Sequence, residues 1–557
     1  MADRTGLRAL CFPLLLLSAC GPGEVTFDTS AADDTDTDTE VEDTDTAVED
    51  TDTTETDTTE TDTEDTAPDI VIAGELSVAP NPDNAFSALA TVTVDHDAEV
   101  WMTYGEGGLD HETSRVSARA GEPVEIVVLG LRASRTFTLA ANAAEGDATW
   151  ASESVAFTTD PLDESWPACT PTFHADESEF DPDEVVCTNL SSSTGVYRYG
   201  CVDRWGEPVY SMRTADNDSL MSMRALADGT WASTSLTASK LALFSATGEQ
   251  TAQYPVDWFN ARTRYRHDYI DSHEVYQIPF GAWEGKLVFL TGIYDYLSDG
   301  SYRLANGLIV WDPASREVLY DYSFHGATGD GVAGDALLPY ERAGYGDYYE
   351  DWNHTNAVLY DEDAKGQGYF LLSLKSQEWI VKLSPDTDAL EWAMGFDGDF
   401  TLVDDIDASR PAAVSTLGWF YHQHGMTFLE RGDARGRLLM FDNGYPRREA
   451  DGSYRWDVYE SRAIEVAYDE VAKTAAVTWS WPEEAGEDSF FSYYCGNAEL
   501  LPGDDAVMLM DGQGSRMVEV GYPTGGKRWE MQCPSVEVCA YRVRYFPSLY
   551  ERGWEDR

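Results

Sequence analysis

Basic residues are scarce in this sequence, and long apolar runs are absent after its N-terminal segment. The 557 residues include 37 Lys and Arg against 101 Asp and Glu, which gives a formal net charge of −64. Because such a surplus repels phosphates, the composition excludes a nucleic-acid-binding protein and disfavours docking on anionic lipid. No segment beyond the N-terminus is apolar and long enough to cross a bilayer as a helix.

Three further patterns are missing. Apolar residues hardly recur at the helical period, which excludes a helix-rich fold. No Cys-x-x-Cys pair occurs, so we expect no resident metal. No glycine-rich phosphate loop opens a helix, so we expect neither a cofactor nor a nucleotide-type donor.

The N-terminus has the pattern of an exported lipoprotein. Two arginines precede the short apolar segment Ala9–Ala19, which ends in Leu17-Ser-Ala-Cys20. This ending resembles the lipobox of bacterial lipoproteins, which implies a signal peptide over residues 1–19 and a lipid on the Cys20 thiol. An ordinary secretory signal that leaves Cys20 unmodified is the alternative.

Residues 20–69 are predicted to be a lipid anchor followed by a disordered linker. From Asp28 to Asp69 the chain consists almost wholly of Asp, Thr and Glu, without Lys or Arg. Such a tract cannot bury enough apolar surface to fold. We therefore expect an exported protein that is anchored in a bacterial membrane, most simply the outer membrane, on its periplasmic or surface face.

Six cysteines follow Cys20, and their even number in an exported chain predicts disulfide bonds. Spacing alone leaves the connectivity open. Cys187 and Cys201 could bridge adjacent strands, and the Cys533–Cys539 segment has the length of a small closed loop.

The globular part is predicted to be all-β, in two domains. Residues 70–162 contain alternating apolar runs such as Thr136–Ala140, typical of a fibronectin III/Ig-like β-sandwich that supports the second domain or forms a homodimer. In residues 163–557, a strand, a turn and a second strand with an aromatic residue recur six times, as in Leu308–Asp312 with Val318–Tyr322. A repeat of about 65 residues predicts a six-bladed β-propeller.

Three histidine segments lie about one blade apart in the second domain. They are Asp271-Ser-His273-Glu274, Asp351-Trp-Asn-His354-Thr-Asn356, and Gln423-His424, followed by Phe441-Asp-Asn443-Gly444. At this spacing the three imidazoles are expected to project into one central channel, which indicates chemistry rather than binding alone. His422 is an alternative to His424, whereas His267 and His325 match no motif and are expected to be structural.

These segments resemble the bacterial arylsulfate sulfotransferase family, over the chain from about residue 75 onwards. That family joins an N-terminal β-sandwich to a six-bladed propeller and keeps its active site in the central channel. The matches around His354 and His424 are specific, and the one at His273 is weak alone. The sequence departs from the family at Ser373-Leu-Lys375, where the family has Ser-x-Arg and the arginine binds sulfate. Lysine keeps the charge but loses the two-pronged guanidinium.

The resemblance implies transfer of a sulfuryl group from an aryl sulfate donor to a phenolic acceptor, through a sulfohistidine on His424. His354 and His273 would be the other catalytic residues, and Lys375 and Asn356 would bind the substrate. A neutral imidazole is a competent nucleophile near pH 7, which suits such a two-step reaction. Two alternatives stay open: a non-catalytic surface module that binds a glycan or protein, and another propeller enzyme such as an aryl sulfate hydrolase or a polysaccharide lyase.

Overall fold

The computed structural model describes residues 72–551, except 83, 147, 163–165, 192–196, 215–216, 236–237, 297–301, 325–348, 405–417, 450–451, 484–488 and 534–538. The lipobox, Cys20, the acidic tract and His325 lie outside the described residues. Among those described, no helix is long and apolar enough to cross a membrane. The few helical segments are α1 (Val256–Asn260) and the 3-10 turns η1 (Glu177–Glu179), η2 (Gly281–Trp283) and η4 (Lys375–Gln377).

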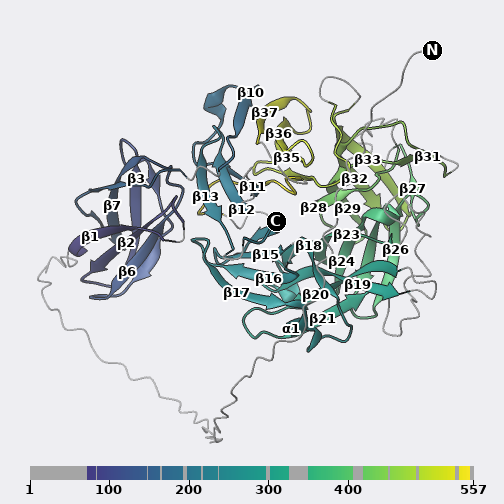
Figure 1. The fold of residues 1–557 in the computed structure, drawn as a ribbon, viewed down its shortest axis with the longest axis horizontal. Helices are drawn as coiled ribbons and strands as arrows, with labels where there is room; N and C mark the ends of the chain where they lie inside the picture. Colours follow the sequence, from purple (N-terminus) through teal and green to yellow (C-terminus); the bar gives the residue numbers. More distant parts are fainter. Residues whose placement is uncertain are drawn as a thin grey trace, which may run out of the picture. The chain divides into compact units, whose positions relative to one another are not determined.

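The first domain is a β-sandwich of two antiparallel sheets (Figure 1). One sheet contains β1 (Ile72–Pro80), β2 (Ala88–Val94) and β6 (Pro123–Val128). The other contains β3 (Ala98–Gly105), β4 (His111–Glu112), β5 (Val116–Ala118), β7 (Thr136–Glu145), β8 (Ala148–Ala151) and β9 (Val155–Thr158). Every second side chain of β2 is buried, as expected of a strand with one face on a core.

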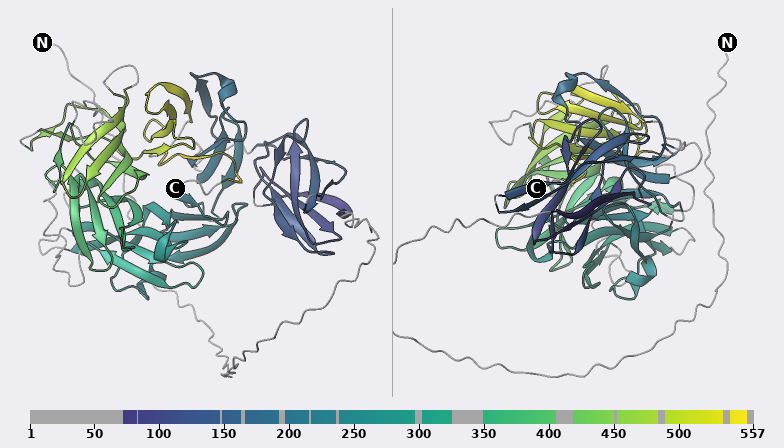
Figure 2. Two further views of the ribbon diagram at one scale, coloured as in Figure 1. Left: turned by 180° about the vertical axis from the view of Figure 1, so that it is seen from behind. Right: turned by 90° about the vertical axis from the view of Figure 1, so that its left-hand side faces the viewer.

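The second domain consists of six sheets around a central axis, which confirms the predicted six-bladed propeller (Figures 1 and 2). Four blades, innermost strand first, are β14 (Leu220–Ala225), β15 (Trp231–Ser235), β16 (Lys240–Phe244) and β17 (Gln250–Pro255); β18 (Tyr269–Gln277), β19 (Leu287–Tyr296), β20 (Tyr302–Trp311) and β21 (Val318–Ser323); β23 (Thr355–Glu362), β24 (Gly368–Leu374), β25 (Trp379–Ser384) and β26 (Ala389–Gly395); and β28 (His424–Glu430), β29 (Arg435–Asp442), β32 (Arg462–Asp469) and β33 (Thr474–Trp481).

The remaining two blades combine strands from both ends of the domain. One contains β38 (Arg544–Phe546), β11 (Val185–Ser191), β12 (Tyr197–Asp203) and β13 (Pro208–Met212), and the other β34 (Asn497–Leu500), β35 (Ala506–Asp511), β36 (Arg516–Gly521), β37 (Lys527–Gln532) and β10 (Thr170–Phe173). Short additions are β22 (Tyr349–Asp351) on β20, β27 (Thr401–Leu402) on β33, and the hairpin of β30 (Arg447–Arg448) and β31 (Tyr454–Arg455). The ring is therefore closed twice, by β10 on β37 and by β38 on β11.

The repeated sequence unit corresponds to the outer hairpin of each blade, as in β20 with β21. Its aromatic residues fill the core, since Trp231, Trp311 and Trp529 are fully buried. Tyr210 of one blade stacks on Trp231 of the next, with ring centroids 5.8 Å apart. The many aromatics thus stabilise the propeller.

Three disulfides join the six cysteines of the described residues, as suits an exported protein. The Cys187–Cys201 bridge links directly opposed residues of β11 and β12, as expected. The expected Cys533–Cys539 loop is wrong, because Cys533 pairs with Cys169 and Cys539 with Cys495. The reason is ring closure, which places β10 beside β37 and so brings together cysteines 364 residues apart.

Candidate active site

The three predicted histidines converge from consecutive blades. His273 lies on β18, His354 directly precedes β23, and His424 is the first residue of β28. One ring nitrogen of each lies within 4.8 Å of the others. His422 does not belong to this group, and the buried His267 instead bonds Thr291 on β19, as befits a structural residue.

His273 is held by Asp271, two residues earlier on the same strand. Its Nδ1 and its backbone N–H both contact the Asp271 carboxylate. Asn306 donates to the other Asp271 oxygen at 2.9 Å and accepts the backbone N–H of Thr355 at 2.8 Å, so it ties the His273 strand to the His354 segment. Burial by itself raises the pKa of Asp271, but the charge and hydrogen bonds of His273 outweigh burial and lower it.

His354 has the same kind of partner, since its Nδ1 contacts the Asp351 carboxylate. Its backbone is in the left-handed region, at φ +44°, a conformation that non-glycine residues adopt rarely and mostly at functional sites. The Lys375 backbone N–H donates to the His354 carbonyl at 3.1 Å and supports this turn. Burial lowers the pKa of His354, against the attraction of Asp351, and the Lys375 charge lowers it further.

The Nε2 atoms of His273 and His354 lie 3.2 Å apart, within hydrogen-bond distance. Each ring directs its Nδ1 at its own carboxylate, which requires a proton on each Nδ1. A hydrogen bond between the two Nε2 atoms then needs one additional proton on the pair. The two rings together can hold that proton and pass it to a ligand.

His424 is fixed in the opposite sense, as a neutral ring. Its Nδ1 contacts two acceptors, Asn443 Oδ1 at 2.6 Å and the His422 carbonyl at 3.1 Å, so Nδ1 carries the hydrogen and Nε2 keeps its lone pair. Burial holds the pKa of His424 well below its usual range, and the Lys375, His354 and His273 charges act in the same direction.

The Phe441-Asp-Asn-Gly motif supplies this support. Asp442 is fully buried and pairs with Arg447 at 3.1 Å and Arg462 at 2.8 Å, while one of its oxygens accepts the Tyr421 backbone N–H. Gly444 has φ +74°, and a Cβ there would lie 2.2 Å from the Glu460 carbonyl oxygen. Each polar or small residue of the motif thus has a physical reason.

Lys375 and Asn356 both lie beside the cluster and are buried. Lys375 begins η4, and burial lowers the pKa of its ammonium against the attraction of Asp351. Asn356 donates to the Gln423 carbonyl at 2.7 Å, directly before His424. Gln423 itself donates to Ser373 and to the carbonyls of Leu374 and Trp379, so it anchors the segment rather than facing a substrate.

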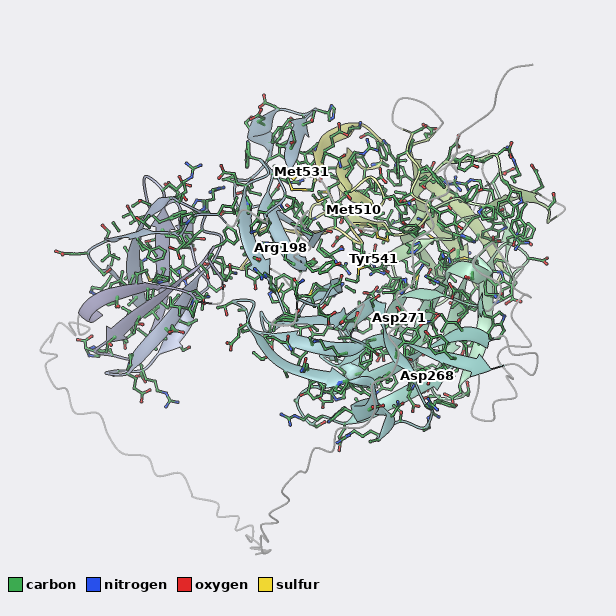
Figure 3. The ribbon with its side chains drawn as sticks, in the orientation of Figure 1. Arg198, Asp268, Asp271, Met510, Met531 and Tyr541 are labelled. Carbon is green, nitrogen blue, oxygen red and sulfur yellow. A yellow bond between two sulfur atoms is a disulfide. The ribbon has the colours of Figure 1, made fainter. Side chains whose placement is uncertain are left out.

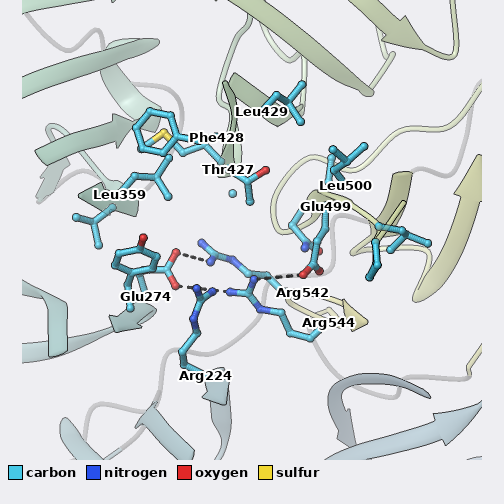
Figure 4. Close-up of a pocket in the computed structure, with 18 of the residues that line it drawn as sticks. Arg224, Glu274, Leu359, Thr427, Phe428, Leu429, Glu499, Leu500, Arg542 and Arg544 are labelled. Atoms are coloured by element: carbon cyan, nitrogen blue, oxygen red, sulfur yellow. Dashed lines mark hydrogen bonds and ion pairs between the residues drawn. The ribbon is translucent and has the colours of Figure 1, made fainter. Parts of the chain in front are cut away.

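An ionic layer separates the histidines from a cavity of about 230 Å³ in the central channel (Figure 4). Arg542 forms an ion pair with Glu274 and donates to the Asn356 carbonyl at 2.7 Å. The preceding Tyr541 contacts the His273 ring, with centroids 5.6 Å apart, and both Tyr541 and Asp271 lie near the centre of the ring of sheets (Figure 3). Glu274 therefore neutralises an arginine and is not the partner of its neighbour His273.

Sequence reasoning gave no role to several residues that the structure places at the site. Asp271 and Asp351 stand two and three residues before their histidines, and this shared upstream position was an available signal. Asn443 lay in a quoted motif without an assigned task. Tyr541 and Arg542 belong to no motif, because they reach the channel only through closure of the ring.

The comparisons with known proteins agree with this description. The family model described as Arylsulfotransferase (ASST) matches residues 197–542, more than half of the chain. A search of curated proteins gave no match. Among solved structures, a protein of unknown function from Bacteroides caccae shares 10% identity at a TM-score of 0.34, over 66% of this chain and 99% of that chain. Virginiamycin B lyase from Staphylococcus aureus shares 9% identity at a TM-score of 0.27, over 65% and 98%.

These structural similarities are too low to carry an argument, whereas the family match spans every residue of the histidine cluster and its supports up to Arg542. The chain belongs to the arylsulfotransferase family.

Proposed function

We propose that this chain carries a sulfuryl group on His424 between an aryl sulfate donor and a phenolic acceptor, in a ping-pong reaction without a nucleotide donor. The observation that carries the proposal is the fixed tautomer of His424, whose Nδ1–H is held by Asn443. Burial lowers the pKa of this ring, so its Nε2 lone pair stays free near pH 7. A neutral imidazole nitrogen in this state is a competent nucleophile.

In the first step, the Nε2 lone pair of His424 forms a bond to sulfur while the bond from sulfur to the aryl oxygen breaks. The bonding electrons leave with the aryl oxygen, which takes the proton shared by His273 and His354. A phenol has a pKa of about 10, so protonation in the transition state assists its departure. The sulfated His424 ring keeps its Nδ1–H on Asn443.

In the second step, the acceptor phenol returns a proton to the His273–His354 pair, and its oxygen attacks sulfur as the N–S bond breaks. Sulfuryl transfer resembles phosphoryl transfer, in which positioning and charge stabilisation supply most of the catalysis. The buried Lys375 ammonium and the second amide hydrogen of Asn356 are suited to the sulfuryl oxygens.

Brief treatment with donor alone tests the covalent step. The peptide that contains His424 should gain the mass of one SO₃ group, and His424→Ala should abolish this gain. His174→Gln is a matched control, because His174 lies at the surface beside Glu530. A label on His422, or turnover of His424→Ala near the parent rate, would contradict the assignment.

A chromogenic aryl sulfate, supplied with and without phenol, identifies the acceptor. Release that depends on phenol indicates the proposed transferase. Release that is equally fast without phenol indicates a hydrolase that uses water. The absence of both release and label under every donor tried would favour a binding module.

A further inference from the structure

We propose that the three-histidine cluster also binds one divalent transition-metal ion, with Zn²⁺ as the best fit, and that this ion inhibits sulfuryl transfer. The ligands are one ring nitrogen each from His273, His354 and His424, which lie within 4.8 Å of one another. The ion is exchangeable and distinct from a resident cofactor. The inhibition rests on the proposed function, whereas the binding does not.

The spacing of the rings suits a zinc ion. Zinc–nitrogen bonds of about 2.0–2.1 Å in a tetrahedron place neighbouring nitrogens roughly 3.4 Å apart. The Nε2 atoms of His273 and His354 are already 3.2 Å apart. The longest separation, at most 4.8 Å, must shorten by roughly 1 Å. A small rotation of the His424 ring supplies such a movement without a change in the strands.

The second nitrogen of every ring is already engaged as it is in metal-binding histidines. Such histidines usually give their other N–H to a carboxylate or carbonyl oxygen, which fixes the tautomer and the direction of the ring. Here the Nδ1 atoms contact Asp271, Asp351 and Asn443 respectively. All three rings can therefore present Nε2 as the free ligand atom.

Charge and ligand type favour a soft or borderline dication. The carboxylates of Asp271 and Asp351 carry two negative charges against the single positive charge of Lys375, and all three groups are buried. Three imidazoles suit Zn²⁺, whereas Ca²⁺ and Mg²⁺ prefer oxygen ligands. Binding must also release the proton that His273 and His354 share, since both Nε2 lone pairs are then used.

Metal and sulfuryl group exclude each other in this arrangement. A metal-bound His424 has no lone pair left for sulfur, and a sulfated His424 has none left for a metal. Zinc should therefore compete with the aryl sulfate donor, and the donor should not be able to sulfate a zinc-loaded chain.

Calorimetry of the full chain with ZnCl₂ tests the binding directly. The buffer should contain excess CaCl₂, so that the acidic tract between Asp28 and Asp69 is occupied by an ion that prefers oxygen. We expect one site, with proton release seen as a dependence of the heat on the buffer. His354→Gln and His273→Gln should each lose this site, and the surface variant His174→Gln should retain it.

A positioning residue gives a graded readout. Asp351→Asn keeps all three ligands but weakens the hold on the His354 ring, and it should lower zinc affinity by roughly 10–100-fold. Co²⁺ serves as a spectroscopic probe, because its visible absorption reports nitrogen ligation, and this absorption should be lost in His354→Gln. Donor turnover by the parent chain should fall with added Zn²⁺, competitively with donor, and recover with EDTA.

The inference and the proposed function fail separately. Equal zinc affinity in the parent and both histidine variants, or faster turnover with zinc, would overturn the inference even if His424 is sulfated. Zinc binding that the variants abolish, in a chain that never acquires the SO₃ label, would uphold the metal site and overturn the proposed function.

Discussion

Asn443 determines which nitrogen of His424 is free. Its Oδ1 accepts the His424 Nδ1–H at 2.6 Å, while its own NH₂ group donates to the carbonyls of Ser492 at 2.7 Å and Cys495 at 3.0 Å. A reversed amide would face two carbonyls with an oxygen, so this network fixes the amide orientation. One buried amide thereby sets the tautomer of the proposed nucleophile.

Removal of this amide should slow sulfation of His424. In Asn443→Ala the ring loses the acceptor that stabilises Nδ1–H as charge develops, and a hydrogen bond to a charged group contributes roughly 1.5–3 kcal/mol. We expect the rate of sulfohistidine formation in a single turnover to fall roughly 10- to 150-fold, with little change in donor binding. A parent-like rate in the folded variant would remove Asn443 from the mechanism.

Lys375 should confer an alkaline limit on donor binding. Burial lowers the pKa of its ammonium, so the charge is lost at a lower pH than for an ordinary lysine, and the KM for donor should rise as the pH increases through this value. Lys375→Arg should bind donor at least as well and should lose this alkaline rise, because arginine stays charged.

Lys375→Ala provides the comparison. Loss of the charged contact should raise KM or lower turnover roughly 10- to 150-fold at neutral pH. Unchanged kinetics in this variant, or an alkaline limb that persists in Lys375→Arg, would exclude Lys375 as the sulfate anchor.

The fold was predictable because its signals are local. Hairpins such as β20 with β21 repeat along the chain, and each carries its own alternation and aromatic residue. Convergence of His273, His354 and His424 followed from the same repeat, since each stands at or just before an innermost strand. A periodic sequence therefore indicates both the propeller and the axis on which its functional residues meet.

The supports of the site could not be predicted, because they depend on closure of the ring. Arg542 lies 186 residues from Asn356 and meets its carbonyl only when the last strand joins the first blade. The same closure pairs Cys169 with Cys533. Asn306 contacts Asp271 through two strands of one blade, a relation that spacing does not encode.

The Cys169–Cys533 bridge should contribute to the stability of the propeller. It closes a loop with a sequence separation of 364, and cross-links of long loops typically stabilise by about 2–5 kcal/mol. The double variant Cys169→Ser/Cys533→Ser should show a lower Tm, with the histidine cluster intact and near-parent turnover below that Tm. Cys187→Ser/Cys201→Ser, across a separation of 14, is the short-loop comparison and should lose less. An unchanged Tm in the first variant would mean that β10 and β38 close the ring unaided.

Cys20 is the proposed point of membrane attachment. In Cys20→Ala the lipid acceptor is lost, so the chain should move from the membrane to the soluble fraction while it keeps its donor turnover. Fractionation of cells that express each version measures this. Continued membrane association of the variant would exclude lipidation at Cys20.

The proton shared by His273 and His354 predicts a dependence on the leaving group. Loss of His354 in His354→Gln removes the partner that lies 3.2 Å from His273 Nε2, and with it the proton donor for the departing aryl oxygen. General acid catalysis contributes roughly 10²–10⁴-fold, but only where the leaving group needs a proton. Turnover of phenyl sulfate should therefore fall by about that factor, whereas turnover of 4-nitrophenyl sulfate should fall much less, because nitrophenolate is a stable anion. His424→Ala is the contrasting variant, since it removes the nucleophile and should abolish turnover of both donors alike. Equal losses on the two donors in His354→Gln would mean that His354 positions the sulfuryl group and does not protonate the leaving oxygen.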